Sequence, residues 1–241
     1  MQNNEQVSSK QNPTIGILTW EYDFPSFRNI VGDYQNPETF DFPVRLLRVP
    51  GANLETIVKS PTQETLEKMI QAARQLEEEG VKAIGTSCGF NARIQRELAD
   101  AVSVPVFASS LLLVPLVHRM LKEGQAVGIL TADAPNLTEK HFRAVGIDSS
   151  VPIHVKGLEE TYSFINIDSN PGVDVVSPEQ LTKDVVEGAK VLVQEHPDVG
   201  AIVLECTALP PFAQAIRQAV GLPVFDVVNL ANMMYRAVAQ E

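Results

Sequence analysis

The 241 residues, of which 44% are hydrophobic and 20% charged, have the composition of a globular protein and suffice to bury a sizeable core. The formal net charge of −11 argues against nucleic acid or an anionic membrane as a partner, because phosphate groups are bound by clustered Lys and Arg. Two cysteines in a chain of this length indicate a reducing compartment rather than a disulfide scaffold, so we expect a cytoplasmic protein.

The chain begins with a polar stretch. Residues 1–12 lack the apolar core of a secretory signal, and we expect them to form a flexible tail. The most apolar run, VPVFASSLLLVPLV at 104–117, is short and interrupted by proline, so no membrane span is predicted.

Short runs rich in Val and Ile then alternate with amphipathic helical stretches. The predicted strands lie near 14–19, 44–49, 81–87, 104–108, 126–131, 151–156, 199–205 and 222–226. The predicted helices cover 61–79, 91–102, 111–123, 136–145, 178–195, 210–220 and 228–240. Because the strands are almost continuously apolar, the pattern is typical of parallel sheets covered by helices on both faces, an α/β fold.

The second half of the chain repeats the first. Residues 81–107 and 199–225 align without a gap at an offset of 118, with nine of 27 positions identical, where ordinary composition gives roughly one or two. IGILT at 15–19 returns as VGILT at 127–131, and SPTQ at 60–63 returns as SPEQ at 177–180. Each SPxQ predicts a helix start with Ser as N-cap.

These repeats predict two duplicated parallel-sheet domains related by a pseudo-two-fold axis, with the active site in the cleft between them. We expect 13–111 plus 227–241 to form the first α/β domain and 112–226 to form the second.

One cysteine ends the equivalent strand of each half: Cys88 ends VKAIGTSC and Cys206 ends VGAIVLEC. Ligands of open parallel sheets bind beyond the carboxyl ends of the strands. A predicted helix follows each cysteine, and its free N–H groups favour a thiolate, which lowers the thiol pKa from about 8.5, or hold a substrate carboxylate.

Two domains facing each other would present both thiols to one cleft from opposite sides. Cys88 and Cys206 could then remove a proton from one face of a carbon and return a proton to the other face. The alternative for either cysteine alone is a small buried apolar residue. Neither cysteine has a second Cys or His at ligand spacing, so no metal is predicted, and without a Gly-rich phosphate loop no cofactor is implied.

Further candidate substrate-binding residues flank these motifs and end neighbouring strands. They are Thr19, Thr86, Ser87, Gly89, Phe90, Ser109, Thr131, Glu205 and Thr207. The alternative for Glu205 is a side chain that faces away from the cleft, since neighbouring strand residues point to opposite faces. The alternative for the hydroxyl residues is that they only satisfy backbone groups at the turns.

Residues 20–43 form a long segment without clear periodicity, and it holds seven of the fifteen aromatic residues of the chain. Loops of this length inside a compact domain are usually functional. Three interpretations stay open: a lid that shields the cleft from water, a dimer contact, or plain packing.

The motifs GTSCGF and LECTALPPFA, in a two-half α/β chain, resemble those of the aspartate/glutamate/hydantoin racemase superfamily over about residues 14–240. The resemblance implies a cofactor-independent, PLP-independent racemase or isomerase with Cys88 and Cys206 as its acid–base pair. It implies a substrate carboxylate on the amides around Gly89, Phe90 and Thr207, and it suggests a homodimer. Glutamate racemases follow the first cysteine with Asn-Thr, whereas Gly89-Phe90 here argues against glutamate and allows a less polar substrate.

Three functions remain open at this point. The first is racemisation or epimerisation at the carbon next to a carboxylate, with a small-molecule carboxylate as substrate. The second is cis–trans isomerisation or decarboxylation of a small dicarboxylate by one thiol. The third is a non-catalytic small-molecule binding protein.

Overall fold

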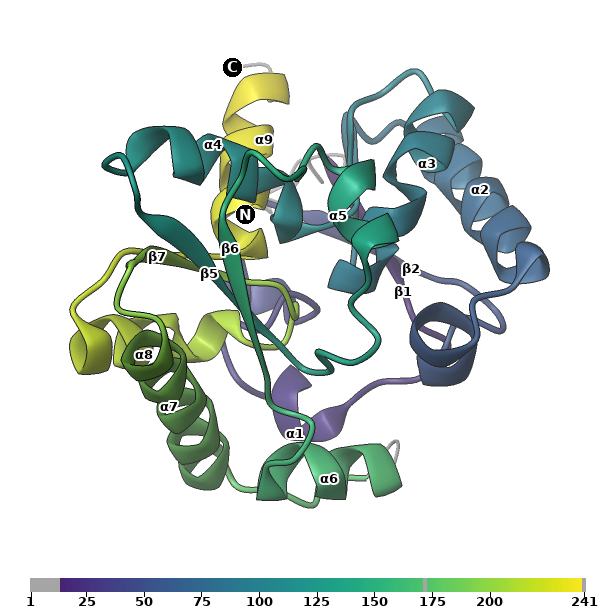
Figure 1. The fold of residues 1–241 in the computed structure, drawn as a ribbon. Helices are drawn as coiled ribbons and strands as arrows, with labels where there is room; N and C mark the ends of the chain where they lie inside the picture. Colours follow the sequence, from purple (N-terminus) through teal and green to yellow (C-terminus); the bar gives the residue numbers. More distant parts are fainter. Residues whose placement is uncertain (1–13, 171–172, 240–241) are drawn as a thin grey trace, which may run out of the picture.

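Two parallel four-stranded sheets with the same strand order form the frame of the molecule (Figure 1). The computed structural model describes residues 14–170 and 173–239, so the predicted tail at 1–12 lies outside the described residues. The first sheet has the order β2-β1-β3-β4 and the second the order β6-β5-β7-β8. The strands are β1 (Ile15–Thr19), β2 (Val44–Arg48), β3 (Ala83–Thr86), β4 (Val106–Phe107), β5 (Ala126–Thr131), β6 (Ile153–Gly157), β7 (Val199–Leu204) and β8 (Val224–Phe225).

The identical strand order confirms the duplicated α/β fold. The helices are α1 (Pro25–Arg28), α2 (Gln63–Glu78), α3 (Gln95–Ala101), α4 (Leu113–Met120), α5 (Glu139–Ala144), α6 (Tyr162–Ser169), α7 (Pro178–Glu195), α8 (Ala213–Val220) and α9 (Val227–Val238). Short helical turns are η1 (Pro37–Thr39), η2 (Leu54–Lys59), η3 (Gly89–Ile94), η4 (Ser110–Leu112) and η5 (Pro210–Phe212). The predictions found every strand but missed α1, η1, η2 and α6.

The two predicted helix starts have different outcomes. Ser177 caps α7 as predicted, since its side chain accepts a hydrogen bond from the N–H of Gln180. The prediction that Ser60 caps α2 is wrong, because Thr62 is the N-cap. Ser60 instead ends η2, and its backbone N–H donates to the carbonyl of Glu55.

The duplication extends to the way the helices pack on the strands. A Cβ at Gly16 of β1 would lie 2.8 Å from Leu76 of α2, and a Cβ at Gly128 of β5 would lie 2.9 Å from Leu192 of α7. Glycine therefore lets the long helix of each half approach the central strand closely.

The two halves meet through contacts at the carboxyl ends of the strands. The Ser110 hydroxyl donates to the carbonyl oxygen of Leu204 at 2.7 Å. Helix α5 of the second half also packs on η3 of the first half. Helix α4 packs on β5 and β7 of the second sheet, and α9 returns to pack on β3 of the first sheet. The precise domain limits stay a prediction. In the part of the chain that the structure describes, no helix has the length and apolar character needed to cross a membrane.

Candidate active site

A cavity of about 780 Å³, counting the solvent at its mouth, lies where the strands of both sheets end. Its walls include Ser87–Phe90 after β3 and Glu205–Ala208 after β7. Both cysteines therefore line one cavity, each from its own half. Thr207 joins the two motifs directly, because its hydroxyl donates to the carbonyl oxygen of Ser87 at 2.6 Å.

Cys88 lies at the start of the helical turn η3, whereas Cys206 begins a turn that precedes η5 and is closed by the Leu209 N–H on the Cys206 carbonyl. Cys88 is the N-cap of η3 and is 7% exposed, whereas Cys206 is half-buried. The backbone N–H of Phe90 acts to lower the pKa of Cys88. The backbone N–H of Ala208 does the same for the pKa of Cys206. A backbone N–H thus acts on each sulfur, from the start of a helical turn at Cys88, as the sequence predicts, and from the turn before η5 at Cys206.

The net direction of the thiol pKa values nevertheless differs from the prediction. Burial raises the pKa of Cys88 well above its usual range, and the negative charge of Glu205 raises it further. Burial and then Glu205 also raise the pKa of Cys206. The expectation of lowered thiol pKa values is therefore wrong, because removal from water outweighs the effect of the N–H groups.

Glu205 is fully buried in the wall of this cavity. Its oxygen Oε2 accepts a hydrogen bond from the Thr131 hydroxyl at 2.7 Å, while Oε1 has no hydrogen-bond partner. Burial raises the pKa of Glu205 to about 7, against the lowering effect of the Thr131 hydrogen bond, and the charge of Asp133 raises it as well. The side chain presses against Gly89, where an added Cβ would lie 2.2 Å from Oε1.

The predicted substrate-binding residues fall into two groups. Ser87, Gly89, Phe90, Glu205 and Thr207 line the cavity. Thr19, Thr86, Ser109 and Thr131 are not among its lining residues. Thr86 donates to the carbonyl oxygen of Ala108 at 2.8 Å, and Ser109 caps η4, so these hydroxyl groups satisfy backbone groups.

Parts of the wall come from segments for which the sequence gave no site prediction. Leu54 and Val58 of η2 and Phe164, Ile167 and Asp168 of α6 line the cavity. These segments have no regular apolar pattern and reach the site only through the tertiary fold. In the second half, the aromatic residues of YSFINIDS were the only feature of the sequence that could have indicated a segment of the cavity wall.

The aromatic segment 20–43 serves two purposes. Trp20, Phe24 and Phe27 line the cavity. Phe42 instead stacks on Tyr235 of α9, with ring centroids 3.9 Å apart. One part of the segment therefore covers the site, and another part packs against the first half.

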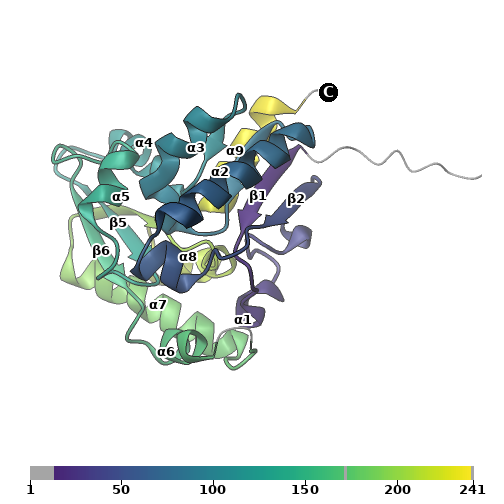
Figure 2. The same ribbon diagram turned by 90° about the vertical axis from the view of Figure 1, so that its right-hand side faces the viewer.

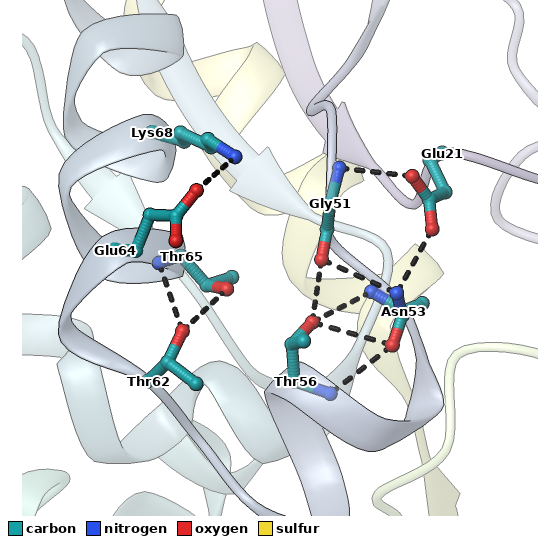
Figure 3. A network of polar contacts seen from close by, with 8 residues as sticks. All are labelled: Glu21, Gly51, Asn53, Thr56, Thr62, Glu64, Thr65 and Lys68. Atoms are coloured by element: carbon teal, nitrogen blue, oxygen red, sulfur yellow. Dashed lines mark hydrogen bonds and ion pairs between the residues drawn. The ribbon is translucent and has the colours of Figure 1, made fainter.

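A polar network fixes the start of this segment (Figure 3). The Glu21 carboxylate accepts hydrogen bonds from the Gly51 N–H at 2.9 Å and from the Asn53 side chain at 2.8 Å. Asn53 also accepts from the N–H of Thr56 and so caps η2. This network ties Trp20, the neighbour of Glu21, to the turn that carries Leu54 and Val58.

Contacts between the two halves join α1 to α6, and Phe27 of α1 and Phe164 of α6 both line the cavity. Helices α1 and α6 lie side by side in both views (Figure 1 and Figure 2), and the Phe27 and Phe164 rings are 5.7 Å apart. The Ser26 hydroxyl donates to Asp174 at 3.0 Å and accepts from the N–H of Val175 at 3.2 Å. Residues from both halves thus cover the cysteines.

The cavity is negatively charged and rich in aromatic rings. Its acidic lining residues are Asp33, Asp133, Asp168 and Glu205, and none of the described residues that line it is Lys, Arg or His. Burial raises the pKa of Asp33 to about 6 and also raises the pKa of Asp168. An uncompensated negative charge of this kind favours a ligand that carries a positive charge.

Four buried polar atoms in the cavity wall have no hydrogen-bond partner: Trp20 Nε1, Gln35 Oε1, Ser87 Oγ and Glu205 Oε1. Buried polar groups are normally satisfied, so these atoms indicate a polar ligand. The nitrogen of Trp20 can only donate, and an ionised Glu205 can only accept. The wall therefore offers partners to both a negative and a positive group.

One cluster of potential metal ligands lies away from the cavity. The ligand atoms of His154, His196 and Asp198 lie within 4.8 Å of one another. The His154 and His196 rings are stacked at 3.8 Å, and His154 pairs with Asp198 at 2.9 Å.

No known protein-family profile matches the chain. The sequence is 31% identical over 234 residues to a dimethylsulfoniopropionate lyase of Durusdinium sp. clade D, covering 94% of this chain and 75% of that protein. It is 30% identical over 234 residues to dimethylsulfoniopropionate lyase 3 of Emiliania huxleyi (strain CCMP1516), covering 92% of this chain. The chain spans 59% of the length of that second relative.

Solved structures with the same fold include a mutant of arylmalonate decarboxylase in its sulfate ion associated form, with a TM-score of 0.63, 19% identity and 95% of both chains covered. They also include glutamate racemase from Francisella tularensis in complex with D-glutamate, with a TM-score of 0.58, 18% identity, and 94% of this chain and 80% of that chain covered. The fold is that of the aspartate/glutamate/hydantoin racemase superfamily, as the motifs around the two cysteines predict.

By its sequence, the chain belongs to the family of the dimethylsulfoniopropionate lyases. Its relatives are therefore enzymes, and their names specify a lyase where the sequence predicted a racemase.

Proposed function

We propose that this protein is a lyase that cleaves a small carboxylate bearing a sulfonium group, of the dimethylsulfoniopropionate type for which its relatives are named. The observation that carries the proposal is the character of the cavity, which combines two thiols with acidic and aromatic side chains and has no basic residue among its described lining residues. This surrounding suits a zwitterion better than it suits a dicarboxylate, which needs a basic partner for its second carboxylate.

The cleavage is an elimination. A thiolate of Cys88 or Cys206 takes a proton from the carbon next to the substrate carboxylate. The electron pair of that C–H bond forms a C=C bond, and the bond from the next carbon to the sulfonium sulfur breaks. Dimethyl sulfide leaves with the electron pair of that bond, and acrylate remains.

The residues of the wall suit the two ends of this substrate. The backbone N–H of Phe90 in η3 and that of Ala208 in the turn after Cys206 act on the two sulfurs, so they can hold the carboxylate and the charge that develops on it. The rings of Trp20, Phe24 and Phe27 can contact the methyl groups of the sulfonium, and aromatic faces attract cations.

Racemisation is the second candidate function. The observation that favours it is that the two cysteines line one cavity from opposite halves. A racemase needs both thiols, whereas an elimination needs a single base.

The test incubates the purified protein with dimethylsulfoniopropionate and measures dimethyl sulfide by gas chromatography and acrylate by NMR. We expect both products in equal amounts, and loss of at least one hundredfold in rate for Cys→Ser at the cysteine that acts as base, roughly the contribution of a positioned base. Parallel incubations of amino acids and 2-aryl carboxylates in D₂O test racemisation. Deuterium exchange there, without dimethyl sulfide from the sulfonium substrate, would replace the lyase proposal with the racemase.

A further inference from the structure

We propose that Glu205 is the specificity-determining residue of the cavity: its unpartnered oxygen Oε1 interacts with the positively charged group of a zwitterionic substrate, and this pairing makes the two neighbouring thiols easier to ionise. The inference rests on the proposed function, since it names the residue that recognises the cation of the proposed substrate.

The first step is the position of the side chain. Glu205 precedes Cys206 in the chain and lies against Gly89, which follows Cys88. The carboxylate is therefore adjacent to both cysteine motifs. Its oxygen Oε2 is held by Thr131 at 2.7 Å, while Oε1 is buried in the cavity wall without a hydrogen-bond partner.

The second step is the missing partner of Oε1. The Glu205 side chain is fully buried, and a buried carboxylate oxygen without a partner is costly. No basic side chain stands among the described lining residues, and Asp33, Asp133 and Asp168 add further negative charge. Only a proton or a cationic ligand can then neutralise Glu205, and the cavity is open to a ligand.

The third step is an asymmetry inside the repeat. The residue equivalent to Glu205 at the offset of 118 is Ser87, which also lines the cavity and also has an unpartnered oxygen. The two halves thus present a neutral hydroxyl beside Cys88 and a carboxylate beside Cys206. A substrate with one negative and one positive end is oriented by this difference, with its cation towards Glu205.

The fourth step concerns the thiols. After burial, the charge of Glu205 is the largest influence that raises the pKa of Cys88 and of Cys206. A cation paired with Glu205 cancels this influence, so the thiols ionise more readily once the substrate is bound. The other acidic groups facing the site are Asp33 and Asp168, which act on Cys206, and Asp133, which acts on Glu205.

The test uses two ligands of the same shape and different charge. The zwitterionic 3-(trimethylammonio)propanoate and its isostere 4,4-dimethylpentanoate, in which an uncharged tert-butyl group replaces the cationic group, are titrated calorimetrically at pH 8 into the wild-type protein and into Glu205→Gln. The wild type should prefer the zwitterion roughly tenfold or more, and Glu205→Gln should reduce this preference to within about threefold. Asp168→Asn, which removes a charge elsewhere in the cavity wall, should lose less.

Two further measurements separate recognition from a structural role. In the wild type, the preference for the zwitterionic ligand should fall between pH 8 and pH 6, because Glu205 becomes protonated. Alkylation of the thiols by iodoacetamide should reach its midpoint at a lower pH in Glu205→Gln, by about one pH unit. The pH series on the wild type tests the proposal even where the variant fails to fold.

Any of three results would overturn the role of Glu205. They are an unchanged ligand preference in Glu205→Gln, equal losses of preference in Glu205→Gln and Asp168→Asn, and a wild-type preference that is constant from pH 8 to pH 6. Absence of dimethyl sulfide production would overturn the lyase proposal alone, since the binding and alkylation measurements do not depend on turnover.

Discussion

Replacing Gly89 by alanine places a methyl group at the point where the two cysteine motifs meet. The added Cβ would lie 2.2 Å from the carbonyl oxygen of Glu205, 2.2 Å from its Oε1 and 2.6 Å from its Cδ. Gly89 is not among the described glycines with positive φ, so the backbone itself accepts alanine. The contact with Glu205 is therefore the reason that glycine is required.

The size of the effect follows from the atoms involved. Ordinary carbon–oxygen contacts are more than 1 Å longer than this, and one of the two oxygens belongs to the backbone, which cannot rotate away. We expect a loss of about 3 kcal/mol in the free energy of unfolding, the upper end of the overpacking range. For a chain of this size, this loss lowers the Tm by about 6–12 °C. The displaced Glu205 should also reduce activity.

The matched control is Gly124→Ala. Gly124 has a φ of +83°, and no atom lies within 4 Å of its added Cβ, so only backbone strain of about 1 kcal/mol is expected there. Thermal unfolding followed by circular dichroism compares the two variants with the wild type. A Tm loss for Gly89→Ala no larger than that for Gly124→Ala would refute the argument.

The remaining predictions test a hydrogen bond that connects the two halves, the buried carboxyl group of Asp33, and the contacts that Ser26 of α1 makes with the second half. Thr207→Val removes the hydrogen bond to the Ser87 carbonyl and should cost about 1–2 kcal/mol in urea unfolding; an unchanged midpoint would contradict this. Burial raises the pKa of Asp33 to about 6 from 3.8, so the folded state holds this proton more tightly than the unfolded state does. The protonated carboxyl therefore stabilises the folded state below pH 3.8, and this stability is lost as the pH rises through 6. Asparagine does not ionise, so the difference in free energy of unfolding between Asp33→Asn and the wild type should shift in favour of the variant by about 2–3 kcal/mol from pH 4 to pH 7.5. If urea unfolding shows the same difference at both pH values, the carboxyl is not buried as described. Ser26→Ala removes the hydrogen bonds to Asp174 and to the Val175 N–H. The KM for dimethylsulfoniopropionate should then rise severalfold, with a Tm loss below about 2 °C. An unchanged KM would show that these contacts between the halves do not assist binding.

The predictability of the elements varied with their local signal. Helix α7 has the predicted limits, because Ser177 and Pro178 mark its start and a regular apolar stripe follows. Helix α2 begins two residues later than predicted, because Ser60 is the C-cap of the unpredicted turn η2 and is not available as the N-cap of α2. A six-residue π-helical turn has too little periodicity to be recognised in one sequence.

The ionisation of the site could not be predicted from the motifs. A cysteine before a helical turn indicates a lowered thiol pKa, and the N–H groups of Phe90 and Ala208 do act in that direction. The opposite net shift comes from burial and from Glu205, and both depend on residues far apart in the chain.

The sequence by itself determined the duplication, the parallel sheets and the position of each cysteine at a strand end, because these follow from local periodicity and from a repeat that is visible along the chain. Only the tertiary structure decided that η2 and α6 complete the cavity and that Glu205 lies against Gly89 with one oxygen unpartnered. The physical reason is that burial and charge pairing depend on which distant segments the fold brings together, and a single sequence does not contain those distances.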